Sequence, residues 1–187
     1  MRKLKLQVQI SVDGYVGAQN GDLDWSTQLD EKCWQVINEL ADSSNILLLG
    51  RKMSEDFIPH FEAFTPDNDR YTFARKMVNI SKIIFTRTLD KAFGKNTSLA
   101  KGNLADEIAT LKKQSGKDIL VYGGAGFVSS LIAGGHIDEF HFFVNPVMIN
   151  KGLKIFDLLY KRQKLSLVSA TPYECGVTVL CYKLNNE

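Results

Sequence analysis

Hydrophobic and polar residues alternate at the start of the chain, over residues 4–12. The apolar side of this alternation consists of Leu4, Leu6, Val8, Ile10 and Val12, and the polar side of Lys5, Gln7, Gln9 and Ser11. A period of two residues is that of a β-strand, whose side chains point alternately to opposite faces of a sheet. The pattern therefore predicts a first strand over residues 4–12.

The next segments change from this period to helical and buried-strand patterns. Residues 27–41 carry apolar side chains at helical spacing and predict an amphipathic helix. The continuous apolar run at residues 46–49 is typical of a strand covered on both faces, and Gly50 ends it. Between the first strand and the helix lies a long loop, and loops of this length in compact domains are often functional.

Strands and helices continue to alternate up to about residue 133, and strands dominate after that point. The pattern predicts helices over residues 70–77, 104–113 and 127–133, and strands over residues 82–86, 118–122, 139–145, 164–171 and 177–184. This order predicts an α/β fold with a mostly parallel central sheet, flanked by helices, and antiparallel C-terminal strands that begin at residue 139. The loosest stretch is 59–69. No repeat or linker divides the chain, so we expect one domain over residues 1–187.

Composition excludes several classes of function. The 187 residues carry a net charge of +2, and the small basic cluster at residues 161–164 is typical of a solvated face, so we expect neither nucleic acid nor membrane as a partner. The three cysteines are odd in number and lack a Cys-x-x-Cys spacing, which favours the reducing cytoplasm. His60, His136 and His141 lack metal-ligand spacing, so we expect no metal.

Glycines and cations follow three of the predicted strands. Gly50-Arg51-Lys52-Met53 and Gly123-Gly124-Ala125-Gly126-Phe127 each lead from a strand into a helix, whose free N–H groups favour an anion. Thr86-Arg87 follows the third strand, and Arg51 with Arg87 would suit a phosphate. Taken singly, the first motif is more typical of a solvated basic pair than of a phosphate site, and the second is equally typical of a tight turn. Parallel strand ends converge at one edge, which favours nucleotide binding.

Candidate acidic groups lie near the first loop. Asp30 is a candidate catalytic residue, but the spacing from Thr27 to Asp30 also fits a variant capping box at a helix start. Asp13 precedes Gly14, and this dipeptide is typical of a turn. Both acids therefore have a structural alternative to a role in chemistry.

Together these motifs resemble the dihydrofolate-reductase-like superfamily and, within it, the RibD C-terminal family, the reductase domain of riboflavin biosynthesis. The resemblance covers essentially the whole chain. Its carriers are the stretch at residues 11–17, Leu49-Gly50-Arg51-Lys52-Met53, Phe85-Thr86-Arg87, Tyr122-Gly123-Gly124-Ala125-Gly126, and Asn145-Pro146-Val147 with Gly152 and Phe156.

The resemblance implies NADPH as cofactor, with the Gly50-Arg51 turn and Thr86-Arg87 holding the adenosine ribose phosphate and residues 123–127 cradling the pyrophosphate. It also implies a cis peptide bond between Gly123 and Gly124. The family has a threonine at the position of Met53, so one hydrogen bond to the cofactor phosphate or the helix start is missing here. The spacing of Trp25 and Asp30 resembles that of the pterin-binding acid in dihydrofolate reductases, but the residues between them match only loosely.

The expected function is that of a stand-alone NADPH-dependent reductase that transfers hydride to a C=N or C=O group of a small heterocyclic metabolite. The resemblance favours a phosphoribosylaminopyrimidine over dihydrofolate as substrate, and it implies a homodimer formed through the C-terminal strands. The loop from Asp13 to Trp25 would cover the nicotinamide, and Gln7 and Gln9 would contact the substrate. The alternatives are a dihydrofolate reductase-like enzyme, a non-catalytic NADPH-binding protein and a domain without a ligand.

Overall fold

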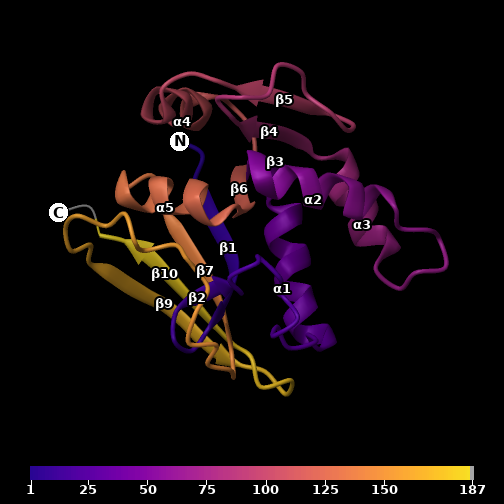
Figure 1. The fold of residues 1–187 in the computed structure, drawn as a ribbon, viewed down its shortest axis with the longest axis vertical. Coiled ribbons are helices and arrows are strands. Elements are labelled where there is room, and N and C mark those ends of the chain that lie inside the picture. The colour runs from indigo at the N-terminus through magenta and orange to yellow at the C-terminus, as the bar shows by residue number, and fades with distance from the viewer. Residues whose placement is uncertain (186–187) are drawn as a thin grey trace.

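An eight-stranded mixed sheet forms the centre of the computed structural model, which describes residues 1–185 (Figure 1). Its spatial order is β5-β4-β3-β6-β1-β7-β10-β9. The strands are β1 (Leu4–Ser11), β3 (Ser44–Gly50), β4 (Ser81–Phe85), β5 (Thr97–Ala100), β6 (Asp118–Gly123), β7 (Glu139–Asn145), β9 (Leu165–Pro172) and β10 (Thr178–Leu184). A separate two-stranded sheet pairs β2 (Tyr15–Gly17) with β8 (Leu153–Lys154).

Six of the eight strands are parallel, from β5 across to β7, while β10 and β9 run antiparallel at the other edge. The predicted α/β class with a mostly parallel sheet and antiparallel C-terminal strands is confirmed. The expectation that residues 139–145 belong to the antiparallel part is wrong. Helix α5 (Ala125–Ala133) precedes β7 and carries the chain back across the sheet, so β7 pairs with β1 in parallel.

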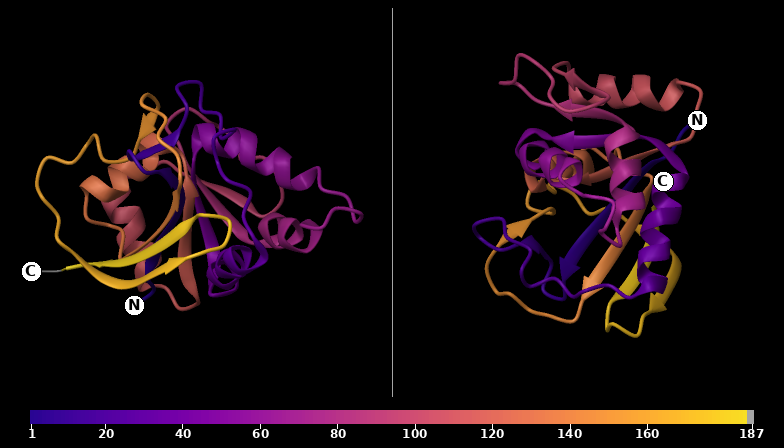
Figure 2. Two further views of the ribbon diagram at one scale, coloured as in Figure 1. Left: turned by 90° about the horizontal axis from the view of Figure 1, so that it is seen from below. Right: turned by 90° about the vertical axis from the view of Figure 1, so that its right-hand side faces the viewer.

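Helices cover both faces of the sheet, as the two views in Figure 2 show. Helices α4 (Leu104–Lys113) and α5 pack on one face, where Ile108 and Val128 join the even-numbered apolar residues of β1. Helices α1 (Glu31–Asp42), α2 (Arg51–Glu62) and α3 (Tyr71–Asn79) contribute to the core on the other face. Trp34 of α1 is half-buried against this second core.

The first strand is buried on both faces, although its alternation suggested one polar face. Gln7 is only 4% exposed and Ser11 only 2%, and the hydroxyl of Ser11 accepts the N–H of Tyr15 in the loop that follows β1. Val12, predicted as the last strand residue, lies beyond the end of β1 and is 61% exposed. The alternation thus predicted the strand correctly, but the position of β1 between β6 and β7 determines how deeply it is buried.

Helix α1 begins four residues later than predicted, and the proposed capping box is wrong. The N–H of Thr27 donates to Oδ1 of Asn145 at 2.8 Å, which keeps residues 27–30 out of the helix. Asp30 is itself the N-cap, and its Oδ1 accepts the N–H of Cys33 at 2.8 Å. A contact with a residue that is distant in sequence therefore determines where this helix starts.

Helix α2 extends through Pro59, so the loose stretch predicted for residues 59–69 begins only after Glu62. Proline lacks an N–H and normally disfavours a helix interior. The aromatic packing of Phe57 against Phe61, with ring centroids 4.5 Å apart, holds α2 together on both sides of the proline. Strands β2, β5 and β8 were not predicted, since each has four residues or fewer.

Candidate functional site

The three motifs singled out in the sequence follow the carboxyl ends of three neighbouring parallel strands, which all lie on the same side of the molecule. Gly50 at the end of β3 is level with Phe85 at the end of β4. On its other side, Leu49 is level with Gly123 at the end of β6. The structure therefore brings the Gly50, Thr86 and Gly123 turns together, at the edge where open α/β sheets bind ligands.

Glycines allow two of these turns to touch. A Cβ on Gly50 would lie 2.8 Å from the Cβ of Phe127, which is too close for a side chain. A Cβ on Gly124 would lie 3.3 Å from the Cα of Gly50, and Gly124 has a φ of +92°, where glycine is favoured. The backbones of the two residues that precede α2 and α5 are thus in close contact.

Both of these helices begin without a side-chain cap. Asp30 caps α1 and Asn103 caps α4, whereas Gly50 and Gly124 precede α2 and α5 and have no side chain to accept the first N–H groups. Neither first turn contains an acidic residue. Two adjacent helix N-termini with free N–H groups fit the pyrophosphate of a dinucleotide such as NADPH.

The cations and the hydroxyl of the predicted phosphate site surround these turns. Arg51 is half-exposed and its Nη1 lies 2.7 Å from Oε1 of Glu55, while Lys52 and Arg87 are exposed. Thr86 is buried, and its Oγ1 accepts the N–H groups of Thr88 and Leu89. The hydroxyl therefore shapes the turn that presents Arg87 to the solvent.

Met53 packs on the glycine turn in place of the threonine that the resemblance suggests. Its Cγ, Sδ and Cε each lie 3.6 Å from the position of a Cβ on Gly123. The cis bond expected between Gly123 and Gly124 is not found, since every peptide bond in residues 1–185 is trans. The turn instead uses positive φ angles at both glycines, +157° and +92°.

Gln7, Gln9 and Trp25, which were predicted to contact a substrate, differ in the hydrogen bonds that their side chains already make within the protein. The side chain of Gln7 has no hydrogen-bond partner within the part of the chain that the structure describes. Oε1 of Gln9 accepts from Asn145 at 2.8 Å. Trp25 donates its Nε1–H to the carbonyl of Asp22 at 3.1 Å, within the loop.

The two candidate acids bind backbone N–H groups. Asp30 accepts the N–H of Cys33 through Oδ1 and that of Cys175 through Oδ2, at 2.8 and 3.1 Å, and these hydrogen bonds lower its pKa. Asp13 accepts from Ser11 Oγ at 2.6 Å and from the N–H of Asn150 at 2.8 Å, and its pKa is lowered too. Both are carboxylates that hold loops in place.

Sequence reasoning missed two residues of this region as candidates. Asn145 is fully buried and joins the segment before α1 to β1 and β7. Tyr122 lies at the end of β6 with its ring against Phe57, at a centroid distance of 5.4 Å, and burial raises the pKa of its hydroxyl. Both residues were noted within motifs, and their position at the ends of strands was the available signal.

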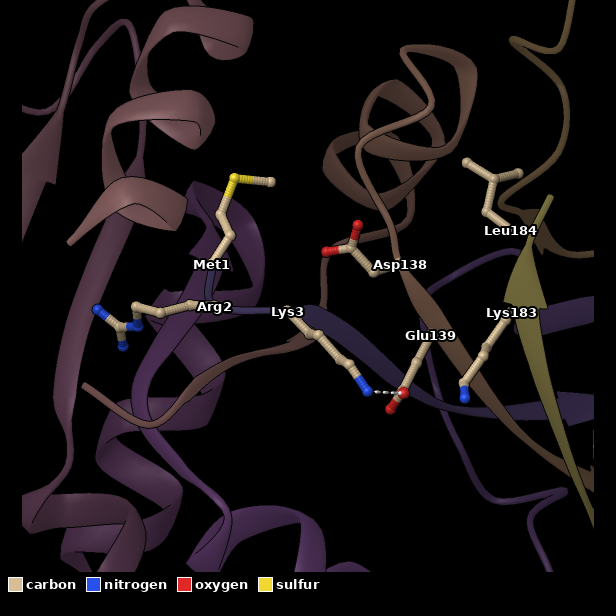
Figure 3. A pocket seen from close by; sticks show the side chains of 7 residues that line it. All are labelled: Met1, Arg2, Lys3, Asp138, Glu139, Lys183 and Leu184. Carbon is tan, nitrogen blue, oxygen red and sulfur yellow. Dashed lines mark hydrogen bonds and ion pairs between the residues drawn. The ribbon is translucent and has the colours of Figure 1, made fainter. Parts of the chain in front are cut away.

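A shallow pocket of about 260 Å³ lies at the opposite ends of the parallel strands, where β1 and β7 begin (Figure 3). Lys3 and Glu139 form an ion pair of 2.7 Å there, and Asp138 is paired with Lys112 at 2.6 Å. These charges already neutralise one another, and none of the three glycine or threonine turns lines the pocket. We therefore place the candidate site at the carboxyl ends of the strands.

No group of three or more His, Cys, Asp or Glu side chains in residues 1–185 is placed to share a metal ion. Cys33, Cys175 and Cys181 are all free thiols. No helix within this range has the length and apolar character required to cross a membrane.

Comparison with known proteins agrees with this architecture. The uncharacterized protein YyaP of Bacillus subtilis (strain 168) is 28% identical over 188 residues, which cover 98% of this chain and 96% of YyaP. A putative riboflavin biosynthesis protein from Shewanella sp. PV-4 has a similar structure, with a TM-score of 0.79, 20% identity and 100% coverage of both chains. Dihydrofolate reductase from Enterococcus faecalis, complexed with NADP(H), has a TM-score of 0.63 and 16% identity, with 98% of this chain and 97% of that chain covered.

The fold is accordingly dihydrofolate-reductase-like. The model of the RibD C-terminal domain family matches residues 2–179, which is nearly the whole chain. This chain therefore belongs to the RibD C-terminal domain family.

Proposed function

We propose that this chain is an NADPH-dependent reductase that transfers hydride to a C=N or C=O group of a small heterocyclic metabolite. The observation that carries the proposal is the contact between the two uncapped helix N-termini, at Gly50 and Gly124, beside Arg51. This arrangement provides N–H donors and positive charge for a dinucleotide. When bound, NADPH supplies the hydride, and the protein orients the two reactants and excludes water.

Each part of the site has a distinct task in this proposal. The first turns of α2 and α5 bind the pyrophosphate, and Arg51 and Arg87 recognise the 2′-phosphate that distinguishes NADPH from NADH. The loop from Asp13 to Trp25 covers the nicotinamide. Gln7 and Gln9 on β1 face the substrate. Asp30, as a carboxylate that accepts two backbone N–H groups, holds the start of α1.

For the substrate we favour an aminopyrimidine such as 5-amino-6-(5-phosphoribosylamino)uracil over dihydrofolate. A pterin ring donates its N–H groups to a carboxylate, whereas both oxygens of Asp30 accept backbone N–H groups of this chain, from Cys33 and Cys175. Dihydrofolate reductase-like activity and a non-catalytic NADPH-binding role remain the alternatives. A substrate-dependent oxidation of NADPH separates the enzyme from the binding protein.

We also propose that two copies of the chain associate through β9. All eight residues of this edge strand are exposed and none is charged, and Leu167 is 58% exposed. Unpaired apolar edge strands readily pair with another chain, and a two-fold axis would place one β9 against the other. Leu158 and Tyr160, in the loop before β9, are 53% and 77% exposed and add to the apolar surface. The three free thiols support a cytoplasmic location.

The proposal is tested by titrating the protein with NADPH and with NADH, followed by assays of NADPH oxidation with aminopyrimidine and dihydropterin substrates. At least tenfold tighter binding of NADPH, or about 1.4 kcal/mol, is expected, with oxidation that depends on the aminopyrimidine. Binding without oxidation by either substrate class would favour the non-catalytic alternative. Absence of binding of either nucleotide would refute the reductase proposal.

A further inference from the structure

The side-chain amide of Asn145 has a single possible orientation. Its Oδ1 accepts the N–H of Thr27 at 2.8 Å, and its Nδ2 donates to the carbonyl of Phe143 at 3.0 Å. A backbone N–H can only donate and a backbone carbonyl can only accept. The positions of oxygen and nitrogen in this fully buried amide are therefore dictated by two backbone groups.

This orientation determines that of Gln9. The same Nδ2 of Asn145 donates to Oε1 of Gln9 at 2.8 Å, so the carbonyl of Gln9 is used inside the protein. The Nε2 of Gln9 has no partner among the described residues. Ser44 Oγ is the one fully buried side-chain nitrogen or oxygen within residues 1–185 that has no partner, so Nε2 of Gln9 is in contact with solvent. Gln9 thus presents its N–H₂ donor outward, while its carbonyl is directed at Asn145.

Gln9 lies beside the candidate site. Gln9 lies near the carboxyl end of β1, which sits between β6 and β7, and the carboxyl ends of these parallel strands lie on the same side of the molecule. Alternation along β1 places Gln9 on the same face as Gln7, and Gln9 is only half-buried there. The free N–H₂ group therefore lies at the same ends of the parallel strands as the glycine turn that follows β6.

We propose that Gln9 is a specificity-determining residue which, held by Asn145, donates a hydrogen bond to an acceptor on the substrate. The acceptor is a ring carbonyl or an unprotonated ring nitrogen of the heterocycle. A substrate with an amino group or a protonated nitrogen at that position would leave two donors facing each other, which is unfavourable. This inference rests on the proposed function, since it requires the substrate to lie against β1.

The test compares two aminopyrimidines in which donors and acceptors are exchanged along the ring edge, 6-aminouracil and 2,4,6-triaminopyrimidine. Their affinities are measured by calorimetry with saturating NADPH, for the wild type, Gln9→Glu and Gln35→Glu. The carboxylate introduced by Gln9→Glu can still accept from Asn145, but it offers an acceptor to the ligand in place of a donor. Gln35 lies on the exposed side of α1 and pairs with Glu39, so Gln35→Glu is a control with the same added charge.

We expect Gln9→Glu to lower the ratio of 6-aminouracil to triaminopyrimidine affinity at least tenfold, and Gln35→Glu to leave it within about twofold. An unchanged ratio in Gln9→Glu, or no binding of either pyrimidine while NADPH is bound, would overturn the inference.

A second measurement needs no ligand and separates this inference from the proposed function. In the wild type, NMR should show rapid solvent exchange of the Gln9 side-chain amide protons and slow exchange of those of Asn145. Slow exchange at Gln9 would overturn the inference whatever the protein binds. Failure to bind NADPH, with rapid exchange at Gln9 retained, would refute the proposed function and leave the orientation of Gln9 established.

Discussion

Gly50 and Phe127 meet so closely that a Cβ on Gly50 would lie 2.8 Å from the Cβ of Phe127. The end of β3 and the first turn of α5 therefore have no room for a side chain between them. We expect Gly50→Ala to push α5 away, to lower the free energy of unfolding by roughly 1–3 kcal/mol and to weaken NADPH binding. Urea denaturation and nucleotide titration measure the two effects.

The matched control for this substitution is Gly126→Ala. A Cβ on Gly126 would meet nothing within 4 Å, and the residue lies inside α5, where alanine is the better helix former. Its stability should therefore be equal to or above that of the wild type. Equal losses of stability in the two variants would contradict the steric explanation.

Arg51 should discriminate between the two nicotinamide cofactors. Its ion pair with Glu55 is half-exposed, and such pairs contribute roughly 0–1 kcal/mol to stability, so Arg51→Ala should unfold at nearly the wild-type temperature. The same variant should bind NADPH at least about tenfold more weakly and NADH almost unchanged. Glu55→Gln, which frees Arg51, serves as the control and should keep or improve NADPH binding. A parallel loss of affinity for both nucleotides in Arg51→Ala would rule out recognition of the 2′-phosphate.

Lys82 should make stability depend on alkaline pH. Its side chain is 2% exposed, and Nζ donates to the carbonyls of Met77, Val78 and Ile80 at the C-terminal end of α3, at 2.8 to 3.0 Å. Burial lowers its pKa from 10.5 to about 8. Between these values the unfolded chain binds the proton more tightly than the folded protein, so the contribution of Lys82 to stability increases as the pH rises from about 8 towards 10.5.

This pH effect is isolated by comparing the wild type with Lys82→Met in urea at pH 7.5 and pH 9.5. The free energy of unfolding of the wild type, relative to the variant, should be higher at the alkaline pH by roughly 1–2 kcal/mol, given about 1.4 kcal/mol per pKa unit. A difference that does not change with pH would show that the pKa of Lys82 is not lowered in the folded protein.

Asp13 should control the mobility of the first loop. Its Oδ2 accepts the N–H of Asn150 and its Oδ1 that of Ile149, so the loop after β1 is joined to the segment before β8. In Asp13→Ala, we expect faster hydrogen exchange in both residues 13–26 and residues 146–154. Asp13→Asn retains one acceptor oxygen and should have an intermediate effect. Faster exchange confined to residues 13–26 would contradict a joint role of the two segments.

Leu167 should be essential for the proposed dimer. It is 58% exposed on the edge strand β9, so a lysine there would bring two positive charges together across a two-fold axis. We expect analytical ultracentrifugation to find a dimer for the wild type and a monomer for Leu167→Lys. Val12→Lys, at a residue 61% exposed and outside β9, should remain dimeric. A monomeric wild type at all concentrations would rule out the dimer.

Most regular elements could be predicted because their signals are local. The predicted ranges 104–113 and 139–145 coincide with α4 and β7, where the apolar pattern is uninterrupted. The short strands β2 and β8 gave no such pattern, because each exists only through pairing with the other across more than 130 residues of sequence. The start of α1 at Glu31 also depends on a distant residue, because the side chain of Asn145 accepts the N–H of Thr27 and holds the preceding segment outside the helix.

The sequence alone determined three properties of this protein. These are the alternation of strands and helices, the glycine turns after residues 49 and 122, and the balance of charge. Each of them depends only on residue types that are close in sequence and on the backbone conformations that those residue types allow. The contact between the Gly50 and Gly124 turns, the capping of a helix by Asp30 and the donor presented by Gln9 became visible only in the folded chain. Each of these depends on strand register or on a hydrogen bond to a distant residue, and neither is encoded in a local pattern.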